Sequence, residues 1–296
     1  MKIVEIKDRS EIIERFGQSS KYYRLTGRLA NQMLGLSDAH AIGRVFNCHM
    51  VVDVTTITRD EGVIPEWTAF IEKWDWLTLI KCESIDSCVP SSELWNSSNA
   101  TKNGLYLDTF GYTGFSVSLD NLVKSGLYKR GSFPFEVNAD EVSQRDEDCA
   151  ISIRGGDYLA FPTLGLLPKG YYKRALKRLK LTSDHNCRVF TDDENRARKM
   201  MRKLKIKNYE FDKEPSPVKA MYNLSKHRQI VMANSTFSYL SCFFSSAEII
   251  VSPSPFYLAE PDWNKRLRLE NEVPVDSFKH PKISFTLLRV RKRIKK

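Results

Sequence analysis

The sequence predicts an α/β protein whose open parallel sheets are covered by helices on both faces. From residue 150 onward, short apolar runs alternate with helical segments at the spacing typical of strand–helix–strand units. Residues 22–54 show the same pattern of strand, loop, helix and strand. The chain has 296 residues, of which 42% are hydrophobic and 28% charged, which is enough for one large domain or two of about 150 residues.

The N-terminal elements are a strand expected at residues 22–25, a helix at 33–46 and a second strand at 49–54. Gly27 and the polar pair Asn31 and Gln32 occupy the turn from the first strand to the helix. Asn31 and Gln32 can hydrogen-bond the phosphate or hydroxyl groups of a ligand, or they can only cap the helix.

The region that follows is less regular. Residues 66–76 are expected to form a helix that brings aromatic side chains into a core. Residues 84–131 are rich in Ser, Asn, Gly and Thr, which is typical of loops that line an acceptor cleft. An acidic stretch at 136–148 ends the N-terminal half, and we expect a domain boundary near Asp148.

The C-terminal half alternates regularly between strands and helices. Strands are expected at residues 150–154, 187–191, 208–211, 229–233 and 249–251, and helices at 171–179, 193–204, 218–225 and 237–244. Ligands of open parallel sheets bind at the carboxyl ends of the strands. The residues that follow these strands are therefore the candidates for a binding site.

Arg154 follows the first of these strands and leads into Gly155, Gly156 and Asp157. Paired glycines allow backbone N–H groups to approach an anion closely. A guanidinium group can bind the two phosphates of a diphosphate in a bidentate manner. The segment therefore predicts a site for a diphosphate.

Thr191, Asp192 and Asp193 follow the next strand. The two carboxylates can hold a sugar or a base, act as a general base, or cap the following helix. All three roles remain open from the sequence alone.

Asn234, Ser235, Thr236 and Phe237 form the turn from the strand at 229–233 into the next helix. A helix that begins there presents unpaired backbone N–H groups and the positive end of its dipole, which suit a phosphate. The alternative is an ordinary strand-to-helix corner that only caps its helix. Together with the other two strand ends, this turn fits a nucleotide-diphosphate sugar.

Several other functions are disfavoured. Neither GxxxxGK[ST] nor GxGxxG occurs, which argues against kinases, ATPases and dehydrogenases. The net charge is +10, but no RNP, zinc-finger or helix-turn-helix pattern accompanies it, so we expect no nucleic-acid partner. Residues 283–296 interleave apolar and basic residues, which suits peripheral contact with an anionic membrane surface or, alternatively, a solvated tail.

Six cysteines lack CxxC spacing, and the start of the chain lacks the apolar core of a signal peptide. The sequence therefore predicts a cytoplasmic, reduced protein that can lie at the inner face of the cytoplasmic membrane.

Five segments in order resemble the GDP-fucose-dependent fucosyltransferases, and most closely the α-1,2-fucosyltransferase family, glycosyltransferase family 11. They are GRLANQM, ISIRGGDYL, LPKGYYKRALKRL, RVFTDDENRARK and IVMANSTFSYL. The family's arginine motif is usually H-V-R-R-G-D-Y. This chain has Ser152 in place of the histidine and Gly155 in place of the second arginine, which leaves altered donor preference or low activity open.

The resemblance implies a GT-B architecture, in which two Rossmann-like domains face a cleft. Residues 1–148 would form the acceptor domain, 149–282 the GDP-sugar domain and 283–296 the basic tail. It also implies metal-independent transfer of fucose from GDP-fucose, with inversion and without a cofactor. The acceptor would be a galactose-terminated oligosaccharide or lipid-linked glycan, commonly at O2 of galactose.

By the same resemblance, Arg154 would grip the donor diphosphate and stabilise the departing GDP. Asp157 is the second catalytic candidate, and Asp38 is the alternative base. The expected donor-binding set is Asn31, Gln32, Arg154, Gly155, Gly156, Thr191, Asp192, Asp193, Asn234, Ser235, Thr236 and Phe237. Two alternatives remain: a transferase for another GDP-sugar or acceptor, such as a protein O-fucosyltransferase, and a non-catalytic protein that binds nucleotide sugars or polyanions.

Overall fold

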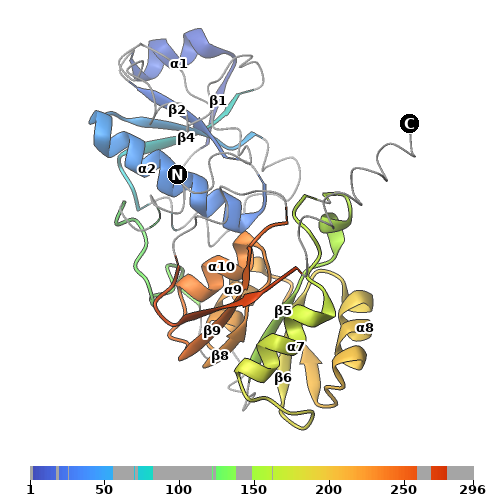
Figure 1. Ribbon diagram of the computed structural model, residues 1–296. Coiled ribbons are helices and arrows are strands. Elements are labelled where there is room, and N and C mark those ends of the chain that lie inside the picture. The colour runs from blue at the N-terminus through green and yellow to red at the C-terminus, as the bar shows by residue number, and fades with distance from the viewer. Residues whose placement is uncertain are drawn as a thin grey trace, which may run out of the picture. The chain divides into compact units, whose positions relative to one another are not determined.

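The chain divides into two compact units, residues 1–136 and 137–296 (Figure 1). The computed structural model describes residues 3–17, 20–25, 27–55, 70, 73–82, 122, 125–137, 149–161, 163–258 and 268–278. The division falls before the boundary expected near Asp148. The tail at 283–296, most of the helix expected at 66–76 and most of the loops expected at 84–131 lie outside the described residues.

The N-terminal unit is built on a four-stranded parallel sheet with the order β1-β4-β3-β2. Its strands and helices are β1 (Val4–Ile6), α1 (Arg9–Phe16), β2 (Lys21–Arg24), α2 (Leu29–Phe46), β3 (Met50–Asp53) and β4 (Leu77–Cys82). The helices α1 and α2 lie on opposite faces of this sheet (Figure 1). Under α1, the side chains of Ile12, Tyr22, Val51 and Ile80 form one buried cluster.

Helix α2 begins at Leu29, before residue 33, where the sequence led us to expect its start. Gly27 adopts a positive φ of 73°, which turns the chain out of β2 at low steric cost. The N–H groups of Asn31 and Gln32 then donate to the carbonyl of Arg28. The segment that we read as a loop is therefore the first turn of the helix.

The C-terminal unit is built on a six-stranded sheet, also fully parallel, with the order β10-β9-β8-β5-β6-β7. The strands are β5 (Cys149–Ile153), β6 (Cys187–Thr191), β7 (Tyr209–Phe211), β8 (Gln229–Val231), β9 (Ile249–Ser254) and β10 (Glu272–Asp276). The helices are the 3-10 helix η3 (Gly156–Leu159), α7 (Lys169–Arg178), α8 (Glu194–Leu204), α9 (Pro217–Ser225) and α10 (Thr236–Phe243). The predicted α/β class with parallel sheets is confirmed, and two such units in one chain are what the GT-B architecture consists of.

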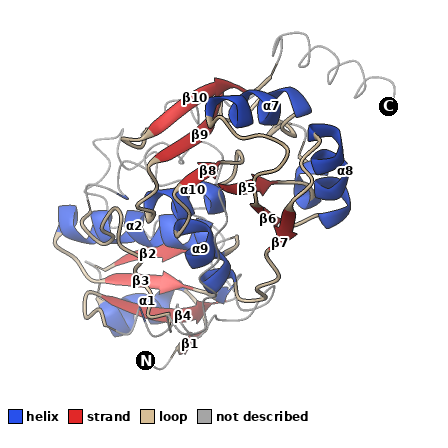
Figure 2. Ribbon diagram, turned by 90° about the horizontal axis from the view of Figure 1, so that it is seen from below, coloured by secondary structure: helices blue, strands red, loops and turns tan. Residues whose placement is uncertain are grey.

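The sheet of the C-terminal unit is covered on both faces, by α7 and α8 on one and by α9 and α10 on the other (Figure 2). Tyr171, Tyr172, Ala175 and Leu176 recur at helical spacing and bury one face of α7 against the strands. Met201 does the same for α8. Both faces of the strands are buried, as expected for a parallel sheet.

The strand order places a reversal at the middle of this sheet. From β5 the chain proceeds outward to β6 and β7, and then it returns to the other side of β5 as β8 and continues to β9 and β10. In open α/β sheets, ligands bind outside the carboxyl ends of the strands at such a reversal. Within the described part of the chain, no helix combines the length and apolar character needed to cross a membrane.

Candidate functional site

Three polar turns meet at the carboxyl edge of the C-terminal sheet. Strand β5 pairs with β6 on one side and with β8 on the other. The residues that follow these strands, Arg154 after β5, Asp192 after β6 and Asn234 in the turn after β8, therefore share one edge at the reversal of the strand order. The structure brings together the C-terminal residues that the sequence singled out.

The guanidinium group of Arg154 lies at the centre of this edge. One terminal nitrogen donates to Oδ1 of Asp157 at 2.7 Å, and the other pairs with Oδ2 of Asp192 at 2.8 Å. The group also lies over the ring of Tyr158, 5.0 Å from its centroid. Its Nε is buried and has no hydrogen-bond partner. Arg154 is thus held from two sides and is 17% exposed at its side chain.

The space beside the paired glycines is occupied by the side chains of Asp192 and Asp193. The N–H of Gly155 donates to Oδ1 of Asp192 at 2.9 Å. A Cβ at Gly155 would lie 2.6 Å from the Cβ of Asp193, and one at Gly156 would lie 2.6 Å from Oδ2 of Asp192. Gly156 also has a positive φ of 31°. In this structure the carboxylate of Asp192 occupies the place that we expected an anion to take beside the Gly155 N–H.

Asp192 and Asp193 have different local roles. Asp193 is the N-cap of α8, and its Oδ1 accepts the N–H of Arg196 at 3.0 Å. The hydroxyl of Thr191 accepts the N–H of Asp193 at 3.0 Å, which fixes the turn before the helix. Of the roles left open from the sequence, Asp193 performs capping, whereas Asp192 pairs with Arg154 and the Gly155 backbone.

The turn after β8 is a capped helix start. Ser235 is the N-cap of α10, and its hydroxyl accepts the N–H of Ser238 at 3.1 Å. Thr236 and Phe237 are half-buried in the first turn of α10, where the positive end of the helix dipole lies. Asn234 is fully buried, and its amide donates to the carbonyls of Leu164 and Gly165 at 3.0 and 2.7 Å. Asn234 thereby ties the turn to residues 164–165.

Tyr158 belongs to this site, although the sequence analysis did not single it out. Its ring supports the Arg154 guanidinium, and its hydroxyl donates to the carbonyl of Asn234. Burial raises the pKa of Tyr158 well above its ordinary value of 10.0, so the phenol stays protonated. The sequence could have indicated Tyr158, because this residue directly follows Asp157 in the arginine segment ISIRGGDYL.

Asn31 and Gln32 lie in the other unit, at the start of α2. Gln32 is buried, and its side-chain amide donates to the carbonyl of Gly27 at 2.8 Å. Asn31 packs so closely on Gly27 that a Cβ there would lie 2.6 Å from its Nδ2. Both side chains support the turn into α2, and their contact with a donor stays a prediction. Asp38 is fully buried on α2 and accepts the hydroxyl of Tyr23 at 3.1 Å, which gives it a structural role.

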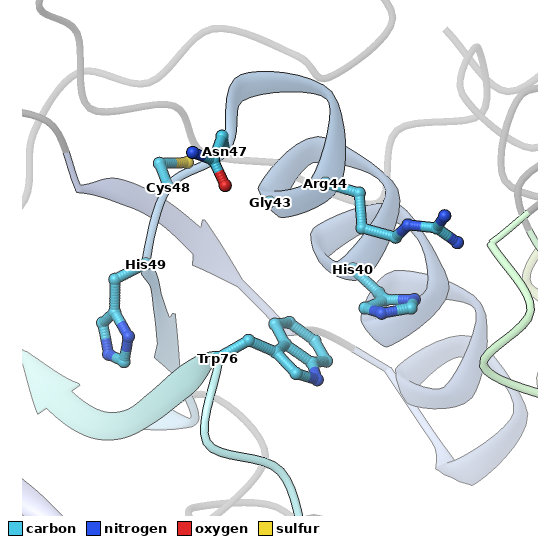
Figure 3. A pocket seen from close by; sticks show the side chains of 7 residues that line it. All are labelled: His40, Gly43, Arg44, Asn47, Cys48, His49 and Trp76. Carbon is cyan, nitrogen blue, oxygen red and sulfur yellow. The ribbon is translucent and has the colours of Figure 1, made fainter.

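A cavity of about 390 Å³ lies at the opposite end of the N-terminal sheet, near the start of β3 and β4 (Figure 3). It is lined by His40, Gly43, Arg44, Asn47, Cys48, His49 and Trp76. The ring centroid of His40 lies 4.7 Å from that of Trp76, so this histidine is a packing residue. None of the residues predicted for donor binding lines the cavity. Among the described residues, no three His, Cys, Asp or Glu side chains gather as a metal site.

Residues 128–270 match the family model described as Glycosyl transferase family 11. This range contains four of the five segments that resemble that family, and the resemblance is thereby confirmed for the C-terminal unit; GRLANQM at 27–33 precedes the range. No curated protein matches the chain.

The chain is similar to the following three solved structures. Escherichia coli heptosyltransferase WaaC with ADP is 10% identical, with 93% of this chain and 99% of that chain covered and a TM-score of 0.44. A point mutant of Arabidopsis thaliana FUT1 in complex with GDP is 12% identical, with 80% and 73% covered and a TM-score of 0.39. WaaG, a glycosyltransferase involved in lipopolysaccharide biosynthesis, is 10% identical, with 91% and 89% covered and a TM-score of 0.36. Because all three scores lie below 0.5, the functional assignment rests on the family match and on the geometry of the site.

Proposed function

We propose that this chain, whose residues 128–270 match glycosyl transferase family 11, is an inverting, metal-independent fucosyltransferase. It transfers fucose from GDP-fucose to a hydroxyl of a galactose-terminated oligosaccharide or lipid-linked glycan. The observation that supports this most is the meeting of Arg154, Asp192 and the start of α10 at the reversal of the strand order, all within the matched range. A guanidinium and a helix N-terminus at such an edge suit the diphosphate of a nucleotide sugar.

The proposed reaction is a single displacement at the anomeric carbon of fucose. The acceptor oxygen forms a bond to this carbon while the bond from the carbon to the β-phosphate oxygen breaks. GDP leaves with the electron pair of that bond, and the hydroxyl proton passes to a base. Arg154 stabilises the charge that builds on the β-phosphate, which is electrostatic catalysis by a positioned cation. The dipole of α10 at Ser235–Phe237 acts in the same direction.

Asp157 is the proposed base, and its exposure favours it over Asp38. The Asp157 side chain is 40% exposed, whereas Asp38 is fully buried and bonded to Tyr23. In this structure Asp157 is paired with Arg154. A diphosphate that engages Arg154 would weaken this pair and leave the carboxylate of Asp157 available for the proton of the acceptor hydroxyl.

Transfer is tested with the purified protein, GDP-fucose and a panel of galactose-terminated acceptors in the presence of EDTA. The proposal predicts a product heavier by one fucose, with an α linkage that reports inversion. Its GDP co-product should appear in equal amount. Transfer that requires an added divalent cation, or hydrolysis of GDP-fucose without transfer, would contradict the proposal.

A transferase for another GDP-sugar is the second candidate, because Gly155 leaves Arg154 as the only guanidinium in the arginine segment. GDP-mannose assayed in parallel with GDP-fucose distinguishes the two. Exclusive turnover of GDP-mannose would favour this second candidate. For the location, we propose the cytoplasm with residues 283–296 at the inner face of the membrane, which salt-sensitive sedimentation with anionic vesicles would test.

A further inference from the structure

The candidate site has an unfavourable charge for its proposed ligand. Arg154 contributes one positive charge, but both its terminal nitrogens are paired with carboxylates, those of Asp157 and Asp192. The three side chains together carry one net negative charge. A diphosphate adds further negative charge, so a second cation near this edge would strengthen its binding.

Arg196 is the candidate for this second cation. It belongs to the first turn of α8, and its N–H donates to Asp193 at the end of β6. Side chains of a helix lean toward its N-terminus, so this side chain extends back toward the same carboxyl edge. Arg196 is half-buried, and its Nε is buried without a hydrogen-bond partner.

The neighbourhood of Tyr172 supports this placement. The hydroxyl of Tyr172 donates at 3.2 Å to the carbonyl of Ser152, near the end of β5. The positive charge of Arg196 opposes the rise of the Tyr172 pKa that burial causes, and the charge of Asp192 acts in the other direction. Arg196 and Asp192 are therefore both within electrostatic range of the end of β5.

The other arginines of the C-terminal unit have different environments. Arg188, Arg198 and Arg228 form ion pairs with acidic residues, and Arg174 donates to the carbonyl of Asp276. Arg178, Arg202 and Arg268 are exposed. Within the described part of this unit, Arg174 and Arg196 are the partly buried arginines without a carboxylate partner, and Arg174 is bound to a backbone carbonyl, whereas the Nε of Arg196 has no partner.

We propose that Arg196 is the second cation of the donor site and binds the diphosphate of the nucleotide sugar. This inference rests on the function proposed above and adds a residue that neither the sequence nor the family match assigned. It also gives a physical reason for Gly155. A Cβ at Gly155 would lie 2.6 Å from that of Asp193, so an arginine at that position would be crowded, and the second guanidinium comes from the first turn of α8 instead.

The test is isothermal titration calorimetry with GDP on the full chain and on the Arg196→Gln, Arg196→Lys and Arg202→Gln variants. Arg202→Gln is the matched control, because it removes one positive charge from an exposed position of the same helix. We expect Arg196→Gln to lose about 10- to 150-fold in GDP affinity, the range for one charge-assisted hydrogen bond. Arg196→Lys should restore part of this affinity, and Arg202→Gln should change it by about twofold or less.

Guanosine, measured by displacement of GDP, separates a phosphate contact from a structural effect. The inference expects similar guanosine affinity for the full chain and for Arg196→Gln, and unchanged melting temperatures. An equal loss for GDP and guanosine, or equal effects of Arg196→Gln and Arg202→Gln, would overturn it while leaving the proposed function intact. If the unaltered chain binds no GDP, the proposed function fails and this inference fails with it.

Discussion

Arg154 and the glycines beside it show how closely the candidate site depends on single atoms. Asp192 reaches Arg154 and the Gly155 N–H at once because Gly156 has no Cβ in its way, and Asp193 packs just as closely against Gly155. From the sequence we expected the two glycines to let backbone N–H groups approach a bound anion. In the structure the two glycines make room for Asp192 and Asp193, which follow the neighbouring strand β6, and this packing depends on strand register and is not visible in a local motif.

At this scale we predict that Gly155→Ala destabilises the C-terminal unit by about 1–3 kcal/mol, the usual cost of overpacking. Its Cβ would lie 2.6 Å from that of Asp193, which forces the start of α8 to shift. The measurement is urea denaturation followed by circular dichroism.

Gly170→Ala is the matched control. A Cβ at Gly170 meets the guanidinium group of Arg174, with its nearest nitrogen at 3.1 Å, and the end of this long side chain can shift by the few tenths of an ångström that the contact needs. Because alanine favours a helix over glycine by about 0.5–1 kcal/mol, Gly170→Ala should leave stability unchanged or raise it. Equal effects of the two substitutions would contradict the packing explanation.

Most elements of the C-terminal unit were predictable because hydrophobic residues recur with a different period in strands than in helices. Strand β6 was predicted at its observed bounds, and α8, α9 and α10 differ by about one residue at their starts. Strand β10 was missed because it contains Pro274 and acidic residues at the edge of the sheet, where proline is tolerated. Strand β1 was missed because three residues are too few to show alternation.

Two capped helices allow the stability and binding roles of a helix start to be separated. Ser235 caps α10 at the candidate site, and Ser216 caps α9, which begins after β7. We predict that Ser235→Ala and Ser216→Ala each lower the free energy of unfolding by about 1 kcal/mol. Thermal denaturation measures this effect.

GDP binding should distinguish the same two variants. Ser235→Ala removes the cap of α10 and should loosen the start of this helix. An anion at a helix N-terminus gains about 0.3–1 kcal/mol, so we expect the GDP affinity of Ser235→Ala to fall about two- to fivefold. The affinity of Ser216→Ala should stay at that of the unaltered chain. A loss of affinity in both variants would show that the effect is general destabilisation.

The whole molecule consists of two units with separate sheets, and each has its own buried polar interactions. In the N-terminal unit, Asp53 is fully buried and accepts the hydroxyl of Tyr22, the Nε of Arg24 and the hydroxyl of Thr55. These hydrogen bonds link the carboxyl end of β2 to the carboxyl end of β3. The network was not predictable, because its members are far apart in the sequence and none belongs to a recognisable motif.

Stability of the N-terminal unit should depend on pH through His40. Burial, and secondarily the charge of Arg44, lower the pKa of His40 below 6.5. As pH falls through 6.5, the unfolded chain binds a proton that the folded chain does not, so the free energy of unfolding decreases until the lower folded pKa is passed. Tryptophan fluorescence follows this unit, because most of the tryptophans lie within residues 1–136.

We therefore predict that lowering the pH from 7.5 to 5.5 reduces the stability of the N-terminal unit, and that His40→Phe reduces this pH dependence. Phenylalanine keeps an aromatic ring against Trp76 but cannot bind a proton. His185→Gln, in the other unit, serves as the control. An equally steep decline in His40→Phe and in the unaltered chain would exclude His40 as the cause.

We propose above all that the carboxyl edge around Arg154 binds the diphosphate of a GDP-sugar. Isothermal titration calorimetry with GDP and GDP-fucose, in the presence of EDTA, tests it most directly when repeated on Arg154→Ala. We predict that the unaltered chain binds both ligands and that Arg154→Ala loses at least one charge-assisted bond, about 1.5–3 kcal/mol or roughly 10- to 150-fold in affinity. No binding of either ligand, or equal binding by Arg154→Ala, would contradict the claim.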